Sequence, residues 1–234
     1  MQVYVVTGAN TGIGYEVARI LYSKNAAVWI AARSEEKGLN AIASIKEAHP
    51  TSNGRLEYLK LDLADLSTIK APAEEFLAKE KRLDVLFNNA GVMLPPKGSK
   101  TAQGYELQLG TNCLGPFLFT QLLTPTLVAT AKTAPKGSVR VVWVSSSAAD
   151  HLNPKGGIDL DNLDYKRDVF YPYRYGISKA GNYYHATEYA RRHREDGIVS
   201  VVSCPSFSLS GISKRGAYIY IIRVSLTRLS LPSR

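Results

Sequence analysis

Tyr175 and Lys179 are the residues of this sequence best suited to moving a proton. They stand four positions apart, so on a helix both side chains leave the same face and can meet. No other tyrosine among the fourteen has a lysine at this spacing. A phenol ordinarily loses its proton near pH ~10, and an adjacent ammonium favours the phenolate. Lowering that pKa to about 7 takes roughly 4 kcal/mol of differential stabilisation. The competing interpretation is a plain Tyr/Lys pair on a helix surface.

A glycine-rich turn near the N-terminus predicts a site for a phosphate-bearing ligand. An apolar run, residues 3–6, precedes the turn, and a helical pattern over residues 15–21 follows it. Glycines in this strand–turn–helix context let a pyrophosphate approach the backbone, and the helix N-terminus offers free N–H groups and a partial positive charge. The alternative is an ordinary strand-to-helix turn. The turn reads Thr7-Gly8-Ala9-Asn10-Thr11-Gly12-Ile13-Gly14.

The end of the next apolar run favours NADP(H) over NAD(H) as the cofactor. A ribose 2′-hydroxyl is usually recognised by a carboxylate about 20 residues after the glycines, whereas a 2′-phosphate calls for an arginine. Here the run over residues 27–32 ends in Arg33, and Glu35 and Glu36 follow only later. The guanidinium of Arg33 can fork onto a phosphate, and Ser34 could add a donor. Otherwise Arg33 is a solvated charge at a strand end.

Apolar runs and helical patterns alternate along the chain. The runs cover residues 3–6, 27–32, 56–61, 83–87, 139–144 and 198–202, and the helical patterns 15–21, 35–48, a segment capped by Asp65 or Ser67, 105–123 and one starting near Tyr175. Several runs are apolar throughout, as in parallel strands buried on both faces. We therefore predict an α/β fold, a single-domain Rossmann-type doubly wound parallel sheet with helices on both faces. We expect this domain to span residues 1–210 and residues 211–234 to form an atypical basic C-terminal tail.

Composition and charge argue against several other classes of protein. With 45% hydrophobic residues among 234, the chain can bury a substantial core, which excludes a disordered protein. Residues 211–234 hold five basic residues and no acid, so residues 1–210 carry only +4 of the net charge of +9. A nucleic-acid partner is therefore not expected. Cys113 and Cys204 are expected as reduced thiols, and the four histidines lack metal-ligand spacing. No transmembrane segment or leader is expected, which favours a cytoplasmic protein.

Six motifs in order make the chain resemble the short-chain dehydrogenase/reductase family over residues 2 to about 205. Within that family it is most similar to the retinol-dehydrogenase-like branch, through Ala32-Arg33, Asn112-Cys113-Leu114-Gly115 and a long insert before Tyr175. The six motifs are the turn at 7–14, Asp62, Asn88-Asn89-Ala90-Gly91, Asn112, the serines at 145–147 and Tyr175-Gly176-Ile177-Ser178-Lys179. The resemblance implies a possible homodimer and hydride transfer between a nicotinamide and a carbonyl or alcohol.

The resemblance also implies a role for each site residue. Tyr175 would be the general acid or base, Lys179 would tune it, and Ser146 would position the substrate oxygen, with Ser147 as the fallback. Asn112 would help hold the lysine and a water chain, unless it is a plain helix-terminal asparagine. Asp62 would contact the adenine, although alone it might equally cap a helix. The expected cofactor contacts are Gly8, Asn10, Thr11, Gly12, Ile13, Gly14, Arg33, Asp62, Asn89, Ala90, Gly91, Tyr175 and Lys179.

Two segments are candidates for the substrate side: residues 91–95, and the insert from His151 to Tyr173. The insert carries Tyr165, Phe170, Tyr171 and Tyr173, which could form an apolar wall for a lipophilic carbonyl or alcohol, or could simply pack the insert onto the domain.

The C-terminus departs from the family pattern. Cys204-Pro205-Ser206 keeps the expected proline but lacks the glycine after it, and the rest looks truncated or replaced. The run 218–226 could supply a substitute strand. An NADP(H)-dependent oxidoreductase is therefore the leading hypothesis. The alternative is a nucleotide-binding protein without turnover, in which the altered tail leaves no substrate lid and no last strand.

Overall fold

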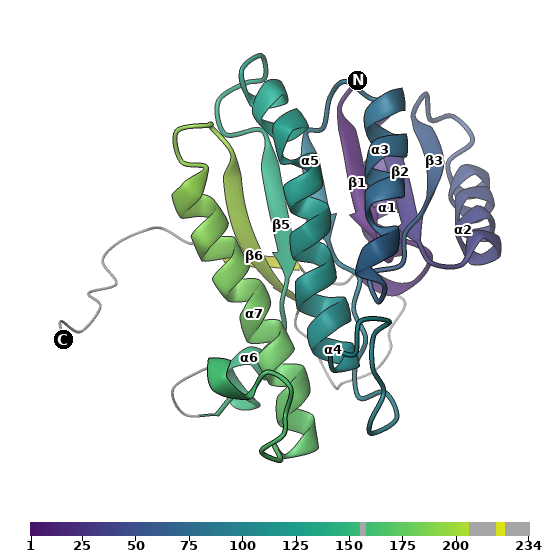
Figure 1. Ribbon diagram of the computed structural model, residues 1–234. Coiled ribbons are helices and arrows are strands. Elements are labelled where there is room, and N and C mark those ends of the chain that lie inside the picture. The colour runs from purple at the N-terminus through teal and green to yellow at the C-terminus, as the bar shows by residue number, and fades with distance from the viewer. Residues whose placement is uncertain (155–157, 206–218, 223–234) are drawn as a thin grey trace.

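The computed structural model describes residues 1–154, 158–205 and 219–222, which build one seven-stranded sheet (Figure 1). The strand order is β3-β2-β1-β4-β5-β6-β7. Six strands are parallel: β1 Val3–Thr7, β2 Ala27–Ala32, β3 Arg55–Lys60, β4 Val85–Asn88, β5 Arg140–Val144 and β6 Val199–Pro205. The order reverses between β1 and β4, where such sheets open a ligand crevice. The predicted doubly wound α/β fold is confirmed.

Helices lie on both faces of this sheet. On one face are α1 Gly12–Ser23 and α2 Glu35–Ala48, and on the other α3 Lys70–Lys79, α5 Gly115–Ala131 and α7 Tyr171–Arg192, which lie side by side in Figure 1. Shorter helices are η1 Leu66–Thr68, α4 Leu107–Leu109, α6 Ala148–His151 and η3 Leu160–Asn162. Side chains alternate across each strand, so Val5 joins the core under α3 and α5, and Val6 joins the core under α1 and α2.

The core under α3, α5 and α7 contains the bulkiest buried side chains. Trp29 and Phe76 meet edge to face with ring centroids 5.3 Å apart, and Phe119, Leu123 and Leu127 of α5 are fully buried against the sheet. Burying side chains of this size contributes roughly 1.5–3 kcal/mol each. This core fixes α5 and α7 against β4 and β5.

The continuous helix at 107–131 is the one described helix long and apolar enough to cross a membrane, by length and composition alone. It has 25 residues and a mean hydropathy of 1.3, and half of its most apolar window is buried. Its inner face packs on the sheet as the core helix of a globular domain does. The expected lack of a transmembrane segment therefore remains a prediction.

The half of the sheet formed by β4, β5 and β6 is less well covered on the α1 side. Val85, Val142 and Val201 form a small cluster there, next to a cavity of about 830 Å³ bounded by Ile20 and Leu21 of α1. Among the described residues, no helix packs directly over this cluster. Among the helices of the described residues, one face thus carries three long ones and the other carries two.

Part of the expected tail joins the sheet. Residues Ile219–Ile222 form β7, which pairs antiparallel with β6 in the register Val202 with Ile222 and Pro205 with Ile219. This strand lies within the run 218–226 that offered a substitute strand. Ser206, where the family glycine is missing, lies outside the described residues, as does the rest of the tail.

Candidate active site

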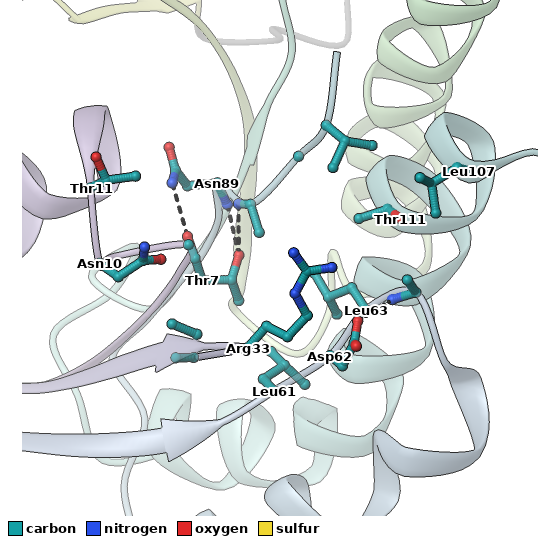
Figure 2. A pocket seen from close by; sticks show the side chains of 17 residues that line it. Thr7, Asn10, Thr11, Arg33, Leu61, Asp62, Leu63, Asn89, Leu107 and Thr111 are labelled. Carbon is teal, nitrogen blue, oxygen red and sulfur yellow. Dashed lines mark hydrogen bonds between the residues drawn. The ribbon is translucent and has the colours of Figure 1, made fainter. Parts of the chain in front are cut away.

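Two cavities share part of their lining at the carboxyl ends of the parallel strands. The first, about 310 Å³, is lined by the glycine turn, Arg33, Asp62 and Thr111 (Figure 2). The second, about 140 Å³, is lined by Ser146, Tyr175 and Lys179. Asn89, Gly91 and Val92 line both. A bipartite ligand, with a nucleotide at one end and a reactive group at the other, matches this arrangement.

Thr7 ties the end of β1 to the end of β4. Its hydroxyl accepts hydrogen bonds from Asn89 N at 3.0 Å and Ala90 N at 2.9 Å, and the Asn89 side chain donates to Thr7 O at 2.9 Å (Figure 2). Thr7 is fully buried. These bonds turn the chain after β4 towards β1, and so hold residues 89–91 against the glycine turn.

In the glycine turn, Gly8 and Gly14 pack closely against residues 89–90, whereas Gly12 faces open space. A Cβ on Gly8 would stand 2.9 Å from Ala90 Cα, and a Cβ on Gly14 would stand 2.5 Å from Asn89 Nδ2. Gly12 has φ +59°, and a Cβ there would meet no protein atom within 4 Å. The space above Gly12 is therefore open for a ligand to approach the backbone.

The start of α1 leaves its N–H groups available. Thr11 is the N-cap but makes no side-chain capping bond, and no acidic residue stands in the first turn. At most helix N-termini a capping side chain accepts a hydrogen bond from one of these N–H groups, or an acidic side chain balances their partial positive charge. An uncapped N-terminus beside the space over Gly12 fits the pyrophosphate of a dinucleotide. Asn10 and Thr11 also line the first cavity, and Ile13 lines the second.

Arg33 and Asp62 lie at the far end of the first cavity, at the ends of β2 and β3 (Figure 2). Arg33 is exposed, and its side chain extends into the cavity. Asp62 accepts a hydrogen bond from Ala64 N at 2.9 Å through Oδ1. It does not cap the following helical turn, because Asp65 does that through its bond from Ser67 N. Ser34 caps α2, accepting from Lys37 N.

The three serines after β5 have different surroundings. Ser145 is buried and donates to Lys179 O at 2.7 Å, whereas Ser147 is exposed at the start of α6. Ser146 alone of these serines combines partial burial with a place beside Tyr175, and its hydroxyl accepts from Ala148 N at 3.2 Å. Burial raises the pKa of Tyr175, while hydrogen bonding to Ser146 opposes that rise.

Lys179 is almost completely buried, and its pKa is lowered to about 8. Burial is the main cause of the lowered pKa, and the nearby thiols of Cys204 and Cys113 raise it in part. The ammonium donates to Val144 O at 2.9 Å and lies 5.8 Å from the Tyr175 ring centroid. Tyr175 and Lys179 therefore share a helix face inside the cleft, not on the protein surface. Both cysteines are free, as the sequence predicts.

Asn112 lies in a π-helical turn, Gly110–Leu114, between α4 and α5. Its Oδ1 accepts from Val92 N at 2.7 Å, and its Nδ2 donates to Val92 O at 2.9 Å and Ser178 Oγ at 3.0 Å. The side chain thus joins the loop after β4 to α7. A Cβ on Gly91 would stand 3.1 Å from Asn112 Oδ1 and 3.3 Å from Lys179 Nζ, so glycine allows these groups to converge.

The aromatic side chains of the insert before Tyr175 contact Arg174, Pro95 and one another. Arg174 stacks over Tyr165 at 4.7 Å, and Tyr171 donates to Pro95 O. Phe170 is exposed and meets Tyr173 edge to face. None of the four insert aromatics lines the described cavities next to Ser146. Of the residues 91–95, Gly91, Val92 and Met93 line the second cavity.

Several cavity-lining residues were not among the sequence-based candidates. Leu63 and Ala64 follow Asp62, and Leu107 and Thr111 lie one helical turn apart ahead of Asn112. The last pair could have been found from its spacing, because positions i and i+4 share a helix face. Within the described part of the chain, no cluster of His, Cys, Asp or Glu could hold a metal ion.

Comparison with known proteins assigns the family. The profile of the short chain dehydrogenase family matches residues 2–158. A short-chain dehydrogenase/reductase from Phomopsis amygdali is 58% identical over 87% of this chain and 61% of its own length. A second, pkfC from Emericella nidulans, is 55% identical over 91% of this chain and 69% of its own length. This chain thus spans roughly two thirds of these relatives.

Solved structures agree with the sequence comparison. A metagenomic short-chain oxidoreductase in complex with NADP superposes with a TM-score of 0.67, is 28% identical, and is matched over 88% of this chain and 83% of its own. The doubly wound sheet with a cleft at its strand ends is the fold that this chain shares with that oxidoreductase. The chain belongs to the short-chain dehydrogenase/reductase family.

Proposed function

We propose that this protein is an NADP(H)-dependent oxidoreductase that interconverts a carbonyl and an alcohol on a lipophilic small molecule, with Tyr175 as general acid or base. One observation supports the proposal most strongly: Ser146, Tyr175 and Lys179 line a single cavity, which shares Asn89, Gly91 and Val92 with the cavity at the glycine turn. Membership in the family indicates an oxidoreductase; the cofactor preference, the lipophilic substrate and the role of Tyr175 are what we propose beyond it.

A bound nicotinamide supplies or accepts the hydride at the substrate carbon. The chain's own residues handle the oxygen and its proton. In the reductive direction Ser146 donates a hydrogen bond to the carbonyl oxygen, and Tyr175 Oη gives that oxygen its proton. Lys179, when charged, stabilises the resulting phenolate. In the oxidative direction the same groups act in reverse, and Tyr175 takes the proton from the alcohol.

The remaining residues of the cleft would hold the cofactor. The free N–H groups at the start of α1 and the open space over Gly12 suit the pyrophosphate, and Arg33 suits a 2′-phosphate because guanidinium forks onto phosphate oxygens. Asp62 keeps Oδ2 available for an adenine amino group. The NADP bound to the metagenomic relative is consistent with this choice.

The retinol-dehydrogenase-like branch, the lipophilic substrate, a homodimer and a cytoplasmic location remain proposals. Met93 and Val92 offer apolar surface beside Tyr175, which favours a lipophilic group next to the reacting carbonyl.

A fluorescence titration with NADPH and with NADH, followed by a screen of carbonyl substrates, tests the proposal. We expect tighter binding of NADPH and carbonyl-dependent oxidation of NADPH. Binding without turnover on any carbonyl or alcohol would favour the alternative, a nucleotide-binding protein without catalysis. Failure to bind either nucleotide would contradict both.

A further inference from the structure

The carbonyl of Val144 is a buried acceptor shared by two side chains of α7. It accepts from Lys179 Nζ at 2.9 Å and from Asn182 Nδ2 at 3.0 Å. Asn182 is 2% exposed and Lys179 is 4% exposed. The two side chains stand three positions apart on the helix, and so lie on one face.

The sheet leaves this carbonyl open on the β4 side. Ser145 N belongs to the same trans peptide unit as Val144 O and donates to Ser203 O of β6, so Val144 O points the opposite way, towards β4. The β4–β5 pairing ends at Asn88 with Trp143. Beyond that point the Asn89 N–H is used by Thr7. Because β4 no longer pairs with β5 at this point, the carbonyl takes its described donors from α7.

We propose that Asn182 is a positioning residue: it holds the Val144 carbonyl so that the Lys179 ammonium can leave that carbonyl for the bound nucleotide. The proposal rests on the proposed function, in which Lys179 acts in the cofactor cleft. A buried carbonyl without any donor is costly, so a lysine that was its sole partner would be penalised for moving. With Asn182 in place, one donor stays on the carbonyl whichever way Lys179 turns.

Asn182 uses only one end of its amide. Its Oδ1 is buried and has no hydrogen-bond partner among the described residues, while its Nδ2 donates to Val144 O. A fully apolar residue of similar size would avoid that cost. The titratable groups around Lys179 are the thiols of Cys113 and Cys204 and the phenol of Tyr175. No described carboxylate is among them.

The test uses two variants and a matched control on the full chain. Asn182→Leu removes the donor at similar size, and Asn182→Asp places an acid where it can retain the ammonium. Thr124→Val is the control, because it removes another buried contact of α7, the 3.0 Å bond between Thr124 Oγ1 and Tyr189 OH. We expect the dissociation constant for NADPH to rise about tenfold in Asn182→Leu and further in Asn182→Asp, and to change less than about twofold in Thr124→Val.

A second readout does not depend on activity. NMR titration of the lysine side-chain signals of the nucleotide-free protein, assigned with Lys179→Arg, should show a higher Lys179 pKa in Asn182→Asp than in wild type, because the new carboxylate favours the ammonium. In steady-state kinetics, Asn182→Leu should lower kcat and raise KM for NADPH, with KM for the carbonyl substrate unchanged.

The outcomes separate this role from the proposed function. Unchanged NADPH binding in both Asn182 variants, with a wild type that binds, would overturn the role of Asn182 alone, as would an unchanged Lys179 pKa in Asn182→Asp. A wild type that does not bind NADPH would overturn the proposed function, and this role with it.

Discussion

The two ends of the cleft are built on different principles. At the proposed nucleotide end, the features are mainly those of the backbone: glycines that leave room for close approach, an uncapped helix N-terminus, and the exposed Arg33 at the end of β2. At the proton-transfer end, the functional groups are side chains of α7 and the loop after β5, and Lys179 is almost fully buried.

The difference has a physical cause. A phosphate carries its own full charge, so partial charges and one arginine suffice to bind it. A tyrosine that must give up a proton near neutrality needs its pKa lowered. Burial by itself raises the pKa of Tyr175, so a nearby cation such as the Lys179 ammonium has to supply the lowering. Substitutions should therefore separate binding from catalysis according to the end at which they fall.

The largest effect is expected at the proton-transfer end. Tyr175→Phe should lower kcat about 10²–10⁴-fold, because the general acid is lost. NADPH affinity should stay within about twofold, since the ring remains. Stopped-flow reduction and a fluorescence titration measure the two quantities. Tyr189→Phe, which alters a buried tyrosine elsewhere on α7, is the control. Equal loss of binding and turnover in Tyr175→Phe would contradict the division of the cleft.

At the nucleotide end, Gly12→Ala should weaken NADPH binding by at least about tenfold, because its Cβ would occupy the open space where the phosphates approach. Gly98→Ala is a matched control: Gly98 has φ +88°, and a Cβ there also meets no protein atom within 4 Å. Both variants should lose about 1–2 kcal/mol of stability, measured by urea unfolding, from the left-handed backbone. Similar NADPH affinities in the two would refute the phosphate site at Gly12.

A smaller and more selective effect is expected at Arg33. Arg33→Ala should weaken NADPH binding about tenfold or somewhat more, as expected for one charge-assisted hydrogen bond to a phosphate. NADH binding should hardly change, because NADH lacks that phosphate. Parallel titrations with the two nucleotides, at one salt concentration, measure the ratio. A proportional loss for both nucleotides would show that Arg33 does not distinguish them.

The smallest expected effect concerns stability and pH. The pKa of Lys179 falls to about 8 in the folded chain, whereas an unfolded lysine titrates near ~10.4. Between these values the unfolded state binds more protons, so wild-type stability should rise with pH through this window. Below pH ~8 holding the buried charge costs about 3 kcal/mol, a value that already includes the bond to Val144 O. An apolar replacement removes this cost, but it also removes a hydrogen bond to Val144 O worth about 1–2 kcal/mol.

Lys179→Met should therefore be about 1–2 kcal/mol more stable than wild type at pH 7, and this gain should shrink above pH ~8. Urea unfolding of both proteins at pH 7 and 9.5 makes the comparison. A variant less stable than wild type at pH 7 would show that the ammonium is better compensated than the structure indicates.

Much of the fold could be predicted from the sequence. Residues 27–32 and 35–48 match β2 and α2 as predicted, because an apolar run and a helical period are local signals. The helix predicted over 105–123 begins at Leu107 and extends to Ala131, since Pro125 is accommodated within α5 and does not end it. The helix expected near Tyr175 starts at Tyr171, with Pro172 at its first turn, where a missing N–H costs nothing.

The sequence by itself determined the glycine turn and Arg33 after the first two strands, and the Tyr175/Lys179 pair on one helix face. The order of motifs also determined the family. These features are readable because each depends on spacing within one element or on what immediately follows it.

Only the tertiary structure decided that Ser146 is the partly exposed serine in the cavity of Tyr175, and that Tyr165 and Tyr171 pack on Arg174 instead of lining the described cavities. It also brought Asn182 and Lys179 onto the Val144 carbonyl. Such contacts depend on where β4 leaves β5 and how α7 crosses the sheet. No local pattern encodes them, because the partners are distant in sequence and meet only through packing.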